Sequence, residues 1–329
     1  MKRTTIKDIA RIVGVTHVTV SKVINNKGRI SQETRKKVLA AIKRFEYYPN
    51  YAARSLVKGK TNNIAVVEPG FSAGFPNIII SGIQDAHVLT GYDLNLYTSS
   101  GTSAGAVHIL KRIVFEKRAD VVIVVSMGMD EEIFLEYKKA GIPVILIETE
   151  TKGASSILAD NEAGAYRATG YLIKKGRRRI GIVAGDLKYS RPQTERYAGF
   201  MRAMHETGIV PPKNLIATTS HYSYADGRQA FKSLAEKGAD AIFSISGDLV
   251  AYGMLAEAGK QGMRVPDDIS IIGFDDDLLS TNIDLTTVKQ PIYEMGKKAF
   301  ELAVLAAEGK LIEPQIIVFE TELKYRGTA

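Results

Sequence analysis

From residue 61 onward, short apolar runs of strand length alternate with longer stretches of helical periodicity. Eight such runs stand out: NIAVVEPG, YDLNLYTS, ADVVIVVS, IPVILIET, RIGIVAGD, NLIATTS, DAIFSIS and DISIIGFDD. Apolar strands that alternate with helices are typical of parallel sheets covered on both faces. The series divides into two similar halves. It therefore predicts an α/β core of two lobes, each a doubly wound parallel sheet, with chain crossings near residues 158–161, 288–291 and 319–326.

Ligands of parallel sheets bind outside the carboxyl ends of the strands, so the cleft between the lobes is the expected binding site. Asp275 directly follows a strand in GFDDD. Three acids in a row are compatible with a metal ion, but no cluster of His or Cys accompanies them. A carboxylate that accepts hydrogen bonds from ligand hydroxyls or amines is the preferred interpretation. Arg196, on a helix after another strand, can clamp a polar ligand group or form an ordinary surface salt bridge.

The charge of the chain is unevenly distributed. Residues 1–60 contain fifteen Lys/Arg and three Asp/Glu, a net charge of +12, whereas the remainder carries a net charge of −4. A basic segment joined to a mildly acidic body is the pattern expected of a protein that binds nucleic-acid phosphates.

The basic segment begins with the pattern of a short amphipathic helix. Its apolar stripe falls at i, i+3, i+4 and i+7: Ile6, Ile9, Ala10 and Val13. Thr5 and Asp8 are placed as in a capping box, and Gly14 ends the helix at a tight turn. This stretch is therefore an ordered element and not a flexible basic tail.

Two further helices follow. The second is capped by Thr16 and packs on the first through an inner face of Val15, Val20, Val23 and Ile24. The third begins near Ser31, and its expected stripe is Val38, Leu39, Ile42 and Phe45. Three short helices around so small a core make a helix-turn-helix domain.

This packing leaves one face of the second helix to meet DNA: His17, Val18, Ser21 and Lys22. Side chains at this end of such a helix contact base edges in the major groove. His17 and Lys22 can donate to purine acceptors, and Val18 can contact a thymine methyl group. We expect phosphate contacts from Thr5, Ser21 and Asn25, and Thr16 is included among the DNA-contacting residues.

After the third helix, Pro49 is followed by NYAARSLV, a helix-forming stretch of about two turns, which is too short to be stable alone in water. It is either a plain linker or a segment that folds only when DNA and a partner chain hold it.

The segment from TIKDIARIVGV to NYAARSL resembles the DNA-binding head of the lac repressor/galactose repressor family of bacterial transcription regulators. The resemblance extends over essentially the whole chain. It implies that the second helix reads the major groove and that the linkers of two subunits pair in the minor groove, where a leucine wedges between base pairs. By position that leucine is Leu56, with Asn50, Ala53 and Arg54 as neighbouring contacts.

The body resembles the sugar- and purine-binding core that these regulators share with periplasmic binding proteins. The resemblance implies six effector contacts: Phe75, Asp160, Arg196, Tyr222, Asp275 and Gln290. Two positions depart from the family pattern, because Gly247 stands where many relatives have asparagine and Pro192 where purine binders have a polar contact. The effector is therefore expected to be a sugar or a related polar metabolite, with its identity left open.

The expected domains are a helix-turn-helix head at 1–48, a hinge at 49–60 and an effector-binding, dimerising core at 61–329. Within the core, lobe 1 spans about 61–160 and 290–320, and lobe 2 about 161–289 and 321–329.

We expect a sequence-specific regulator, in the first place a repressor, that acts as a homodimer on a near-palindromic operator of double-stranded DNA. The alternative is a solute-binding protein with the same core fold. No phosphate-binding loop, nucleophile elbow or cysteine is present, so we expect neither an enzyme nor a bound cofactor or metal. No apolar run is long enough for a membrane span, and the expected location is the bacterial cytoplasm, at the nucleoid.

Overall fold

The computed structural model describes residues 4–48, 59–70, 74–88, 90–99, 102–188, 190–211 and 213–329. It divides into two compact units, Met1–Thr61 and Asn62–Ala329. The predicted hinge residues Asn50, Ala53, Arg54 and Leu56 lie outside the described residues.

The first unit contains three helices: α1 Ile6–Val13, α2 His17–Ile24 and α3 Gln32–Arg44. Each begins at a predicted cap. Thr5 and Asp8 form a reciprocal capping box, the Thr16 hydroxyl accepts from the backbone N–H of Thr19, and Ser31 accepts from that of Thr34. These bonds satisfy N–H groups that have no partner within their helix.

The small core of the first unit confirms the inner faces predicted for α1 and α2. It consists of Ile9, Ala10, Val20, Val23, Val38, Ala41 and Tyr47, with Val15 and Ile24 packed against it. The stripe predicted for α3 is wrong in part, because Leu39 is 49% exposed and Phe45 37% exposed. The inward face of α3 instead follows Val38 and Ala41, three residues apart, and Tyr47 completes the core.

The second unit contains two six-stranded sheets, in the orders β11-β5-β4-β3-β1-β2 and β12-β10-β9-β8-β6-β7. The strands of the first sheet are β1 Asn63–Glu68, β2 Asp93–Thr98, β3 Val121–Val125, β4 Val144–Ile147, β5 Ser155–Ala159 and β11 Ile316–Phe319. Those of the second are β6 Ile180–Ala184, β7 Ile216–Thr218, β8 Ala241–Ser244, β9 Ser270–Asp275, β10 Thr287–Lys289 and β12 Glu322–Lys324. All described pairings are parallel except that of β10 with β12. The two-lobed α/β fold is thus confirmed, with one antiparallel edge strand.

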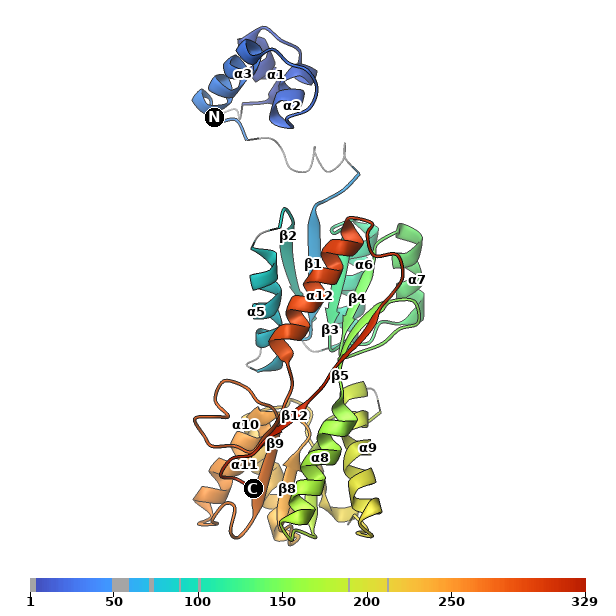
Figure 1. Ribbon diagram of the computed structural model, residues 1–329, viewed down its shortest axis with the longest axis vertical. Helices are drawn as coiled ribbons and strands as arrows, with labels where there is room; N and C mark the ends of the chain where they lie inside the picture. The colour runs from blue at the N-terminus through green and yellow to red at the C-terminus, as the bar shows by residue number, and fades with distance from the viewer. Residues whose placement is uncertain are drawn as a thin grey trace. The chain divides into compact units, whose positions relative to one another are not determined.

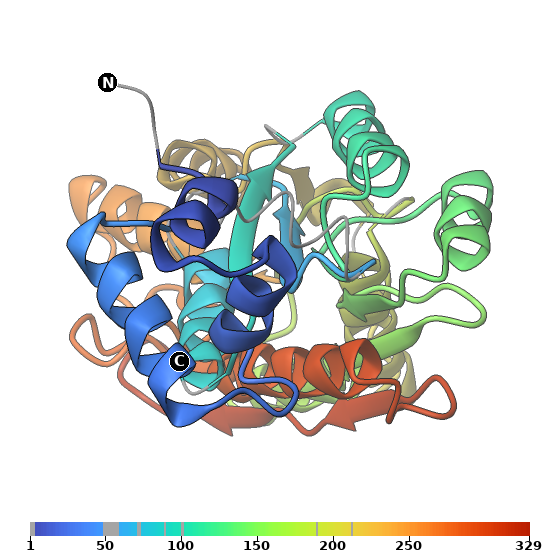
Figure 2. The ribbon, with the colours of Figure 1, turned by 90° about the horizontal axis from the view of Figure 1, so that it is seen from above.

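Helices cover both faces of each sheet. On the first sheet, α5 Phe75–His87 and α12 Ile292–Ala307 cover one face, and α6 Ser103–Phe115 and α7 Glu131–Ala140 the other (Figures 1 and 2). On the second, α8 Asn161–Lys174 and α9 Arg191–Glu206 cover one face, and α10 Tyr224–Glu236 and α11 Asp248–Lys260 the other. A short 3₁₀ turn, Lys213–Leu215, precedes β7. The chain passes between the sheets three times, after β5, after β10 and after β11 (Figure 1).

Glycines set the spacing of three helix pairs. A Cβ on Gly199 of α9 would lie 2.1 Å from the Glu162 carbonyl oxygen of α8. On α5 and α12, Gly82 and Gly296 approach each other's helices as closely, and Gly227 and Gly253 do the same on α10 and α11. A side chain at these positions would meet backbone atoms that cannot rotate away. The helices therefore pack at distances that only glycine permits.

We predict that Gly253→Ala destabilises the protein by about 1–3 kcal/mol or more, because its Cβ would lie 2.0 Å from the Tyr224 carbonyl oxygen. Gly259→Ala, on the same helix, is the matched control, since nothing lies within 4 Å of its Cβ position. The control should be neutral or stabilising by roughly 1 kcal/mol at most. Urea unfolding measures both changes, and equal effects would contradict this account of the packing.

Candidate functional site

The exposed face of α2 is the first candidate site. His17 and Lys22 are exposed, and Val18 is 49% exposed although it is apolar. Ser21 and Asn25 are half-buried, and the Asn25 amide donates to the Ser21 carbonyl oxygen at 2.8 Å. Because Val20 and Val23 point into the core, the helix holds these side chains on a fixed outer face.

Some of the residues predicted to contact DNA also have structural roles within the head. The side chains of Thr5 and Thr16 serve as helix caps. His17, Val18 and Lys22 cap no helix in the described structure.

Arg196 is the centre of the second candidate site, at the junction of the two sheets. The residue is 5% exposed and lies on α9. Its Nε donates to Asn161 Oδ1 at 2.7 Å and its Nη1 to the Ile245 carbonyl oxygen at 2.8 Å. The guanidinium carbon lies 3.7 Å from the centroid of the Phe274 ring. Burial lowers the pKa of Arg196, and neighbouring carboxylates oppose this effect. The surface salt bridge considered from sequence is therefore wrong.

Asp275 and Gln290 lie beside this guanidinium. Asp275 Oδ1 is 3.8 Å from Arg196 Nη2 and accepts from Gln290 Nε2 at 2.6 Å. Burial raises the pKa of Asp275 to about 6, although Arg196 and the bond from Gln290 act in the opposite direction. Gln290 is 3% exposed, and within the described structure its Oε1 has no hydrogen-bond partner.

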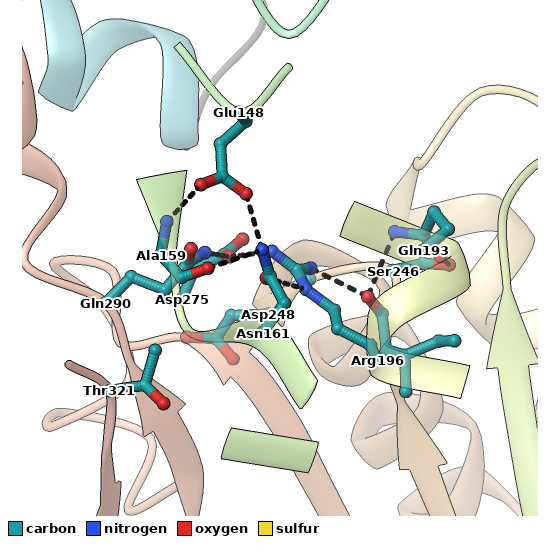
Figure 3. Close-up of polar contacts among 12 residues, drawn as sticks. Glu148, Ala159, Asn161, Gln193, Arg196, Ser246, Asp248, Asp275, Gln290 and Thr321 are labelled. Carbon is teal, nitrogen blue, oxygen red and sulfur yellow. Dashed lines mark hydrogen bonds and ion pairs between the residues drawn. The ribbon is translucent and has the colours of Figure 1, made fainter. Parts of the chain in front are cut away.

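Glu148 connects the two lobes. It directly follows β4 of the first sheet, accepts from the Ala159 backbone N–H at 2.6 Å and accepts from Asn161 Nδ2 at 2.8 Å (Figure 3). Because Asn161 in turn accepts from Arg196, a continuous chain of hydrogen bonds runs from the first lobe into the second. Burial raises the pKa of Glu148, and Arg196 acts against this shift. On the more exposed flank, Arg191 forms an ion pair with Glu150 at 2.9 Å.

Asp248 supports the loop that follows β9. It is 1% exposed and accepts from Ser280 Oγ and Thr287 Oγ1, each at 2.6 Å, and from the Asp277 backbone N–H at 3.1 Å. Burial raises its pKa well above the usual range, and the nearby Asp275 acts in the same direction. Asp248 thereby fixes the backbone beyond Asp275.

The structure gives a reason for glycine at position 247. Its φ is +103°, and a Cβ there would lie 2.8 Å from Asp275 Oδ2. Glycine therefore lets the backbone approach the Asp275 carboxylate closely.

The structure brings three of the six predicted effector residues into direct contact: Arg196, Asp275 and Gln290. Tyr222 is 38% exposed with φ of +53°, and its hydroxyl lies over Gly185 at the end of β6. Asp160 caps α8 by accepting from the Ala163 backbone N–H at 3.1 Å, so one of its oxygens is already engaged. Phe75 begins α5 and packs partly buried on the first-lobe core.

Sequence reasoning missed Glu148, Asn161 and Asp248. Glu148 follows β4 directly, and that position was a usable signal; Asp248 begins α11 after the turn that follows β8, and Asn161 follows the predicted contact Asp160. In the described parts of the chain, no group of three or more His, Cys, Asp or Glu side chains could hold a metal ion. No helix among the described residues is long and apolar enough to cross a membrane.

Comparison with known proteins decides the family. The profile of the lacI family of bacterial regulatory proteins matches residues 5–50, and that of the periplasmic binding protein-like domain matches residues 169–329. Catabolite control protein A of Priestia megaterium is 32% identical over 328 residues, covering 98% of each chain. The chain belongs to the lacI family. This regulator therefore combines a DNA-binding head with an effector-binding core.

Other relatives agree with this placement of the regulator. The repressor PurR of Photobacterium profundum is 32% identical over 327 residues, covering 98% of this chain and 97% of that protein. Among solved structures, a CelR–cellobiose complex has a TM-score of 0.74 at 27% identity, covering 99% of this chain and 100% of that one. The lac repressor dimer bound to operator and an anti-inducer has a TM-score of 0.86 at 24% identity, covering 99% of each chain, and shows the shared fold.

We predict that Arg196→Ala destabilises the folded regulator by about 3–5 kcal/mol, because Asp275 and Asn161 would be left buried without their partner. Arg202→Ala is the control on the same helix, since Arg202 pairs with Glu162 at the surface and should contribute roughly 1 kcal/mol or less. Chemical unfolding measures the free energy of unfolding of both variants. A small effect of Arg196→Ala would contradict the central role of this residue.

We also predict a pH dependence from Asp275. Its folded-state pKa of about 6 lies above its ordinary value of 3.8, so the folded state prefers the protonated form. As pH rises from about 4 to about 7, the wild type should lose up to about 3 kcal/mol of stability relative to Asp275→Asn. Urea unfolding of both proteins across this range measures the difference, and a difference that does not vary with pH would refute the assignment.

Proposed function

We propose that this regulator is a transcriptional repressor that binds a near-palindromic operator of double-stranded DNA as a homodimer. The observation that carries the proposal is the outer face of α2, where His17, Val18 and Lys22 are exposed within the basic segment 1–60, whose net charge is +12. Each head would read one half-site, with Thr5, Thr16, Ser21 and Asn25 toward the phosphates. The lac repressor dimer bound to operator supports this arrangement by analogy of fold.

We propose the domain limits expected from sequence, with a head at 1–48, a hinge at 49–60 and a core at 61–329. Within the hinge, Asn50, Ala53, Arg54 and Leu56 would contact the minor groove at the operator centre.

The core would bind a small polar effector at the carboxyl ends of the strands, through Phe75, Asp160, Arg196, Tyr222, Asp275 and Gln290. The chain of bonds from Glu148 to Arg196 supports this proposal, because a ligand at Arg196 also contacts the junction between the lobes. The cellobiose complex among the solved relatives supports a saccharide or a related metabolite.

In this proposal the chain acts by binding and not by catalysis, within the bacterial cytoplasm. An effector that changes the angle between the lobes would change the separation of the two hinges in the dimer. The heads would then be held on the operator or released from it.

Selection of the full-length protein against a pool of random DNA duplexes tests the proposal. Two half-sites related by a two-fold axis should be enriched, and their affinity should fall linearly on a log–log plot against salt concentration. Enrichment of a single asymmetric site, or of none, would contradict a homodimeric repressor.

We predict that Lys22→Ala weakens operator binding by about 1–3 kcal/mol and relaxes the preference at one base pair of each half-site. The reason is that the exposed Lys22 ammonium donates to a base edge. Lys260→Ala, at the exposed end of α11 in the core, should leave affinity and preference unchanged. A uniform loss of affinity without a change in preference would show that Lys22 contacts only phosphate.

A further inference from the structure

A cation on the second lobe forms ion pairs with a carboxylate of each lobe. Arg191 begins α9, and its Nη2 lies 2.9 Å from Oε2 of Glu150, which stands between β4 and β5 of the first sheet. Its Nε lies 2.9 Å from Oε1 of Glu195, one turn further along α9. One guanidinium group therefore joins the first lobe to the second.

The pair with Glu195 lies entirely within the second lobe. Arg191 and Glu195 are four residues apart on α9, the spacing at which side chains on one helix meet. Glu195 Oε2 also accepts from Asn161 Nδ2 at 3.4 Å, and Asn161 accepts from Arg196 at the centre of the site. If the angle between the lobes changes, Arg191 therefore remains with Glu195 and loses Glu150.

The position of Arg191 does not favour α9 itself. The first turn of a helix carries a partial positive charge, so an acid is stabilising there and a cation is not. This first turn contains no acidic residue, and the Ser190 side chain makes no capping bond. The contact of Arg191 with the other lobe gives a reason for a cation at this position.

The segment that follows β4 makes two contacts with the second lobe, and they differ in burial. Glu148 and Asn161 are 3% and 2% exposed, so water is excluded from the bond between them (Figure 3). The side chains of Arg191 and Glu150 are 33% and 39% exposed. Exposed charges exchange a protein partner for water with a small change in free energy, whereas buried polar groups do not. The exposed pair is therefore the contact that can open and close reversibly.

A further N–H group of Arg191 limits the strength of this arrangement. Arg191 Nη1 is buried and has no hydrogen-bond partner among the described residues. A buried donor without an acceptor costs free energy, and this cost offsets part of the gain from the two ion pairs. An interaction with a small net free energy leaves both lobe arrangements accessible, so that a ligand can shift the balance between them.

We propose that the Arg191–Glu150 pair is a latch between the lobes. While the pair is formed, the lobes keep the angle of this structure; when it opens, Arg191 stays with Glu195 and the lobes move apart. The latch goes beyond the proposed function, because it is a property of the core that does not require DNA or an effector.

The test measures the distance between the lobes in the full-length protein. The chain contains no cysteine, so Lys111→Cys on α6 and Lys260→Cys on α11, both at exposed positions, provide one spin-label site on each lobe. Dilution of the labelled protein with unlabelled protein restricts the measurement to distances within one chain. Pulsed electron–electron double resonance then gives the populations of the lobe separations.

Arg191→Gln and Glu150→Gln each remove one side of the latch. Each should change the ratio of the lobe separations by at least about threefold. The double variant should change it no further, because the same interaction is lost in all three proteins. Arg202→Gln is the matched control and should have no effect, since Arg202 pairs with Glu162 within the second lobe.

Two results would overturn the latch: an unchanged distance distribution in either single variant, or effects of the two variants that add. Glu150→Gln leaves α9 as it is, so the test stands even if Arg191→Gln fails to fold.

Salt provides an independent measurement on the same labelled proteins. Raising NaCl from about 50 mM to about 500 mM weakens the attraction between exposed charges. The wild type and Arg202→Gln should shift toward the distribution of the latch variants, whereas Arg191→Gln and Glu150→Gln should change little. An equal response to salt in all four proteins would contradict the latch.

Operator binding by the same variants separates the latch from the proposed function. If the lobe angle controls the hinges, Arg191→Gln and Glu150→Gln should change ligand-free operator affinity in the same direction by at least about threefold. Shifted lobes with unchanged operator affinity would refute the proposed coupling to DNA and support the latch. An unchanged lobe distribution would refute the latch, whatever the operator affinity.

Discussion

The buried guanidinium of Arg196 holds the effector core together. It bonds to the start of α8 through Asn161 and to the end of β8 through Ile245, and it stacks on Phe274 of β9. A charge in so dry a place is tolerated only when hydrogen bonds and an opposite charge surround it. Asp275 supplies that charge, and Gln290 holds the carboxylate in turn. The geometry of the strand ends therefore depends on one cation.

Glycine residues allow the helices of the core to pack closely against one another. Three helix pairs, α5 with α12, α8 with α9 and α10 with α11, approach through glycines whose missing side chains would strike backbone. Such contacts leave each pair little freedom to slide. The helices of each lobe are therefore held at fixed spacings, and the contacts between the lobes include the bonds of Glu148, the ion pair of Arg191 with Glu150 and the three connecting segments.

The sequence predicted the fold class well because its signals were periodic. The strands that are apolar along their whole length, such as β3 and β6, and the capped helices of the head were found from local pattern alone. The short strands β10 and β12 carry three residues each, too few for a period to be recognised. The predicted apolar stripe of α3 included Leu39 and Phe45, which are exposed. A short helix can have apolar residues on more than one face, and the sequence alone does not show which face packs into the core.

The candidate effector site was less predictable. Arg196, Asp275 and Gln290 were identified by resemblance, but their mutual contacts join residues far apart in the chain. Glu148 and Asp248 carry no motif, and their importance follows from burial and from bonds to distant backbone. Buried polar groups of this kind are specified by the assembled fold and not by any local pattern.

Gln290 ends the second passage of the chain between the lobes and stands one residue before Pro291, the cap of α12. Its amide bonds to Asp275 of the second lobe, while the helix that follows packs into the core of the first. Gln290, a proposed effector contact, thus also lies in a segment that connects the two lobes. A ligand that bonds to this amide would contact the segment that connects the lobes. Its binding energy would therefore shift the equilibrium between lobe angles directly.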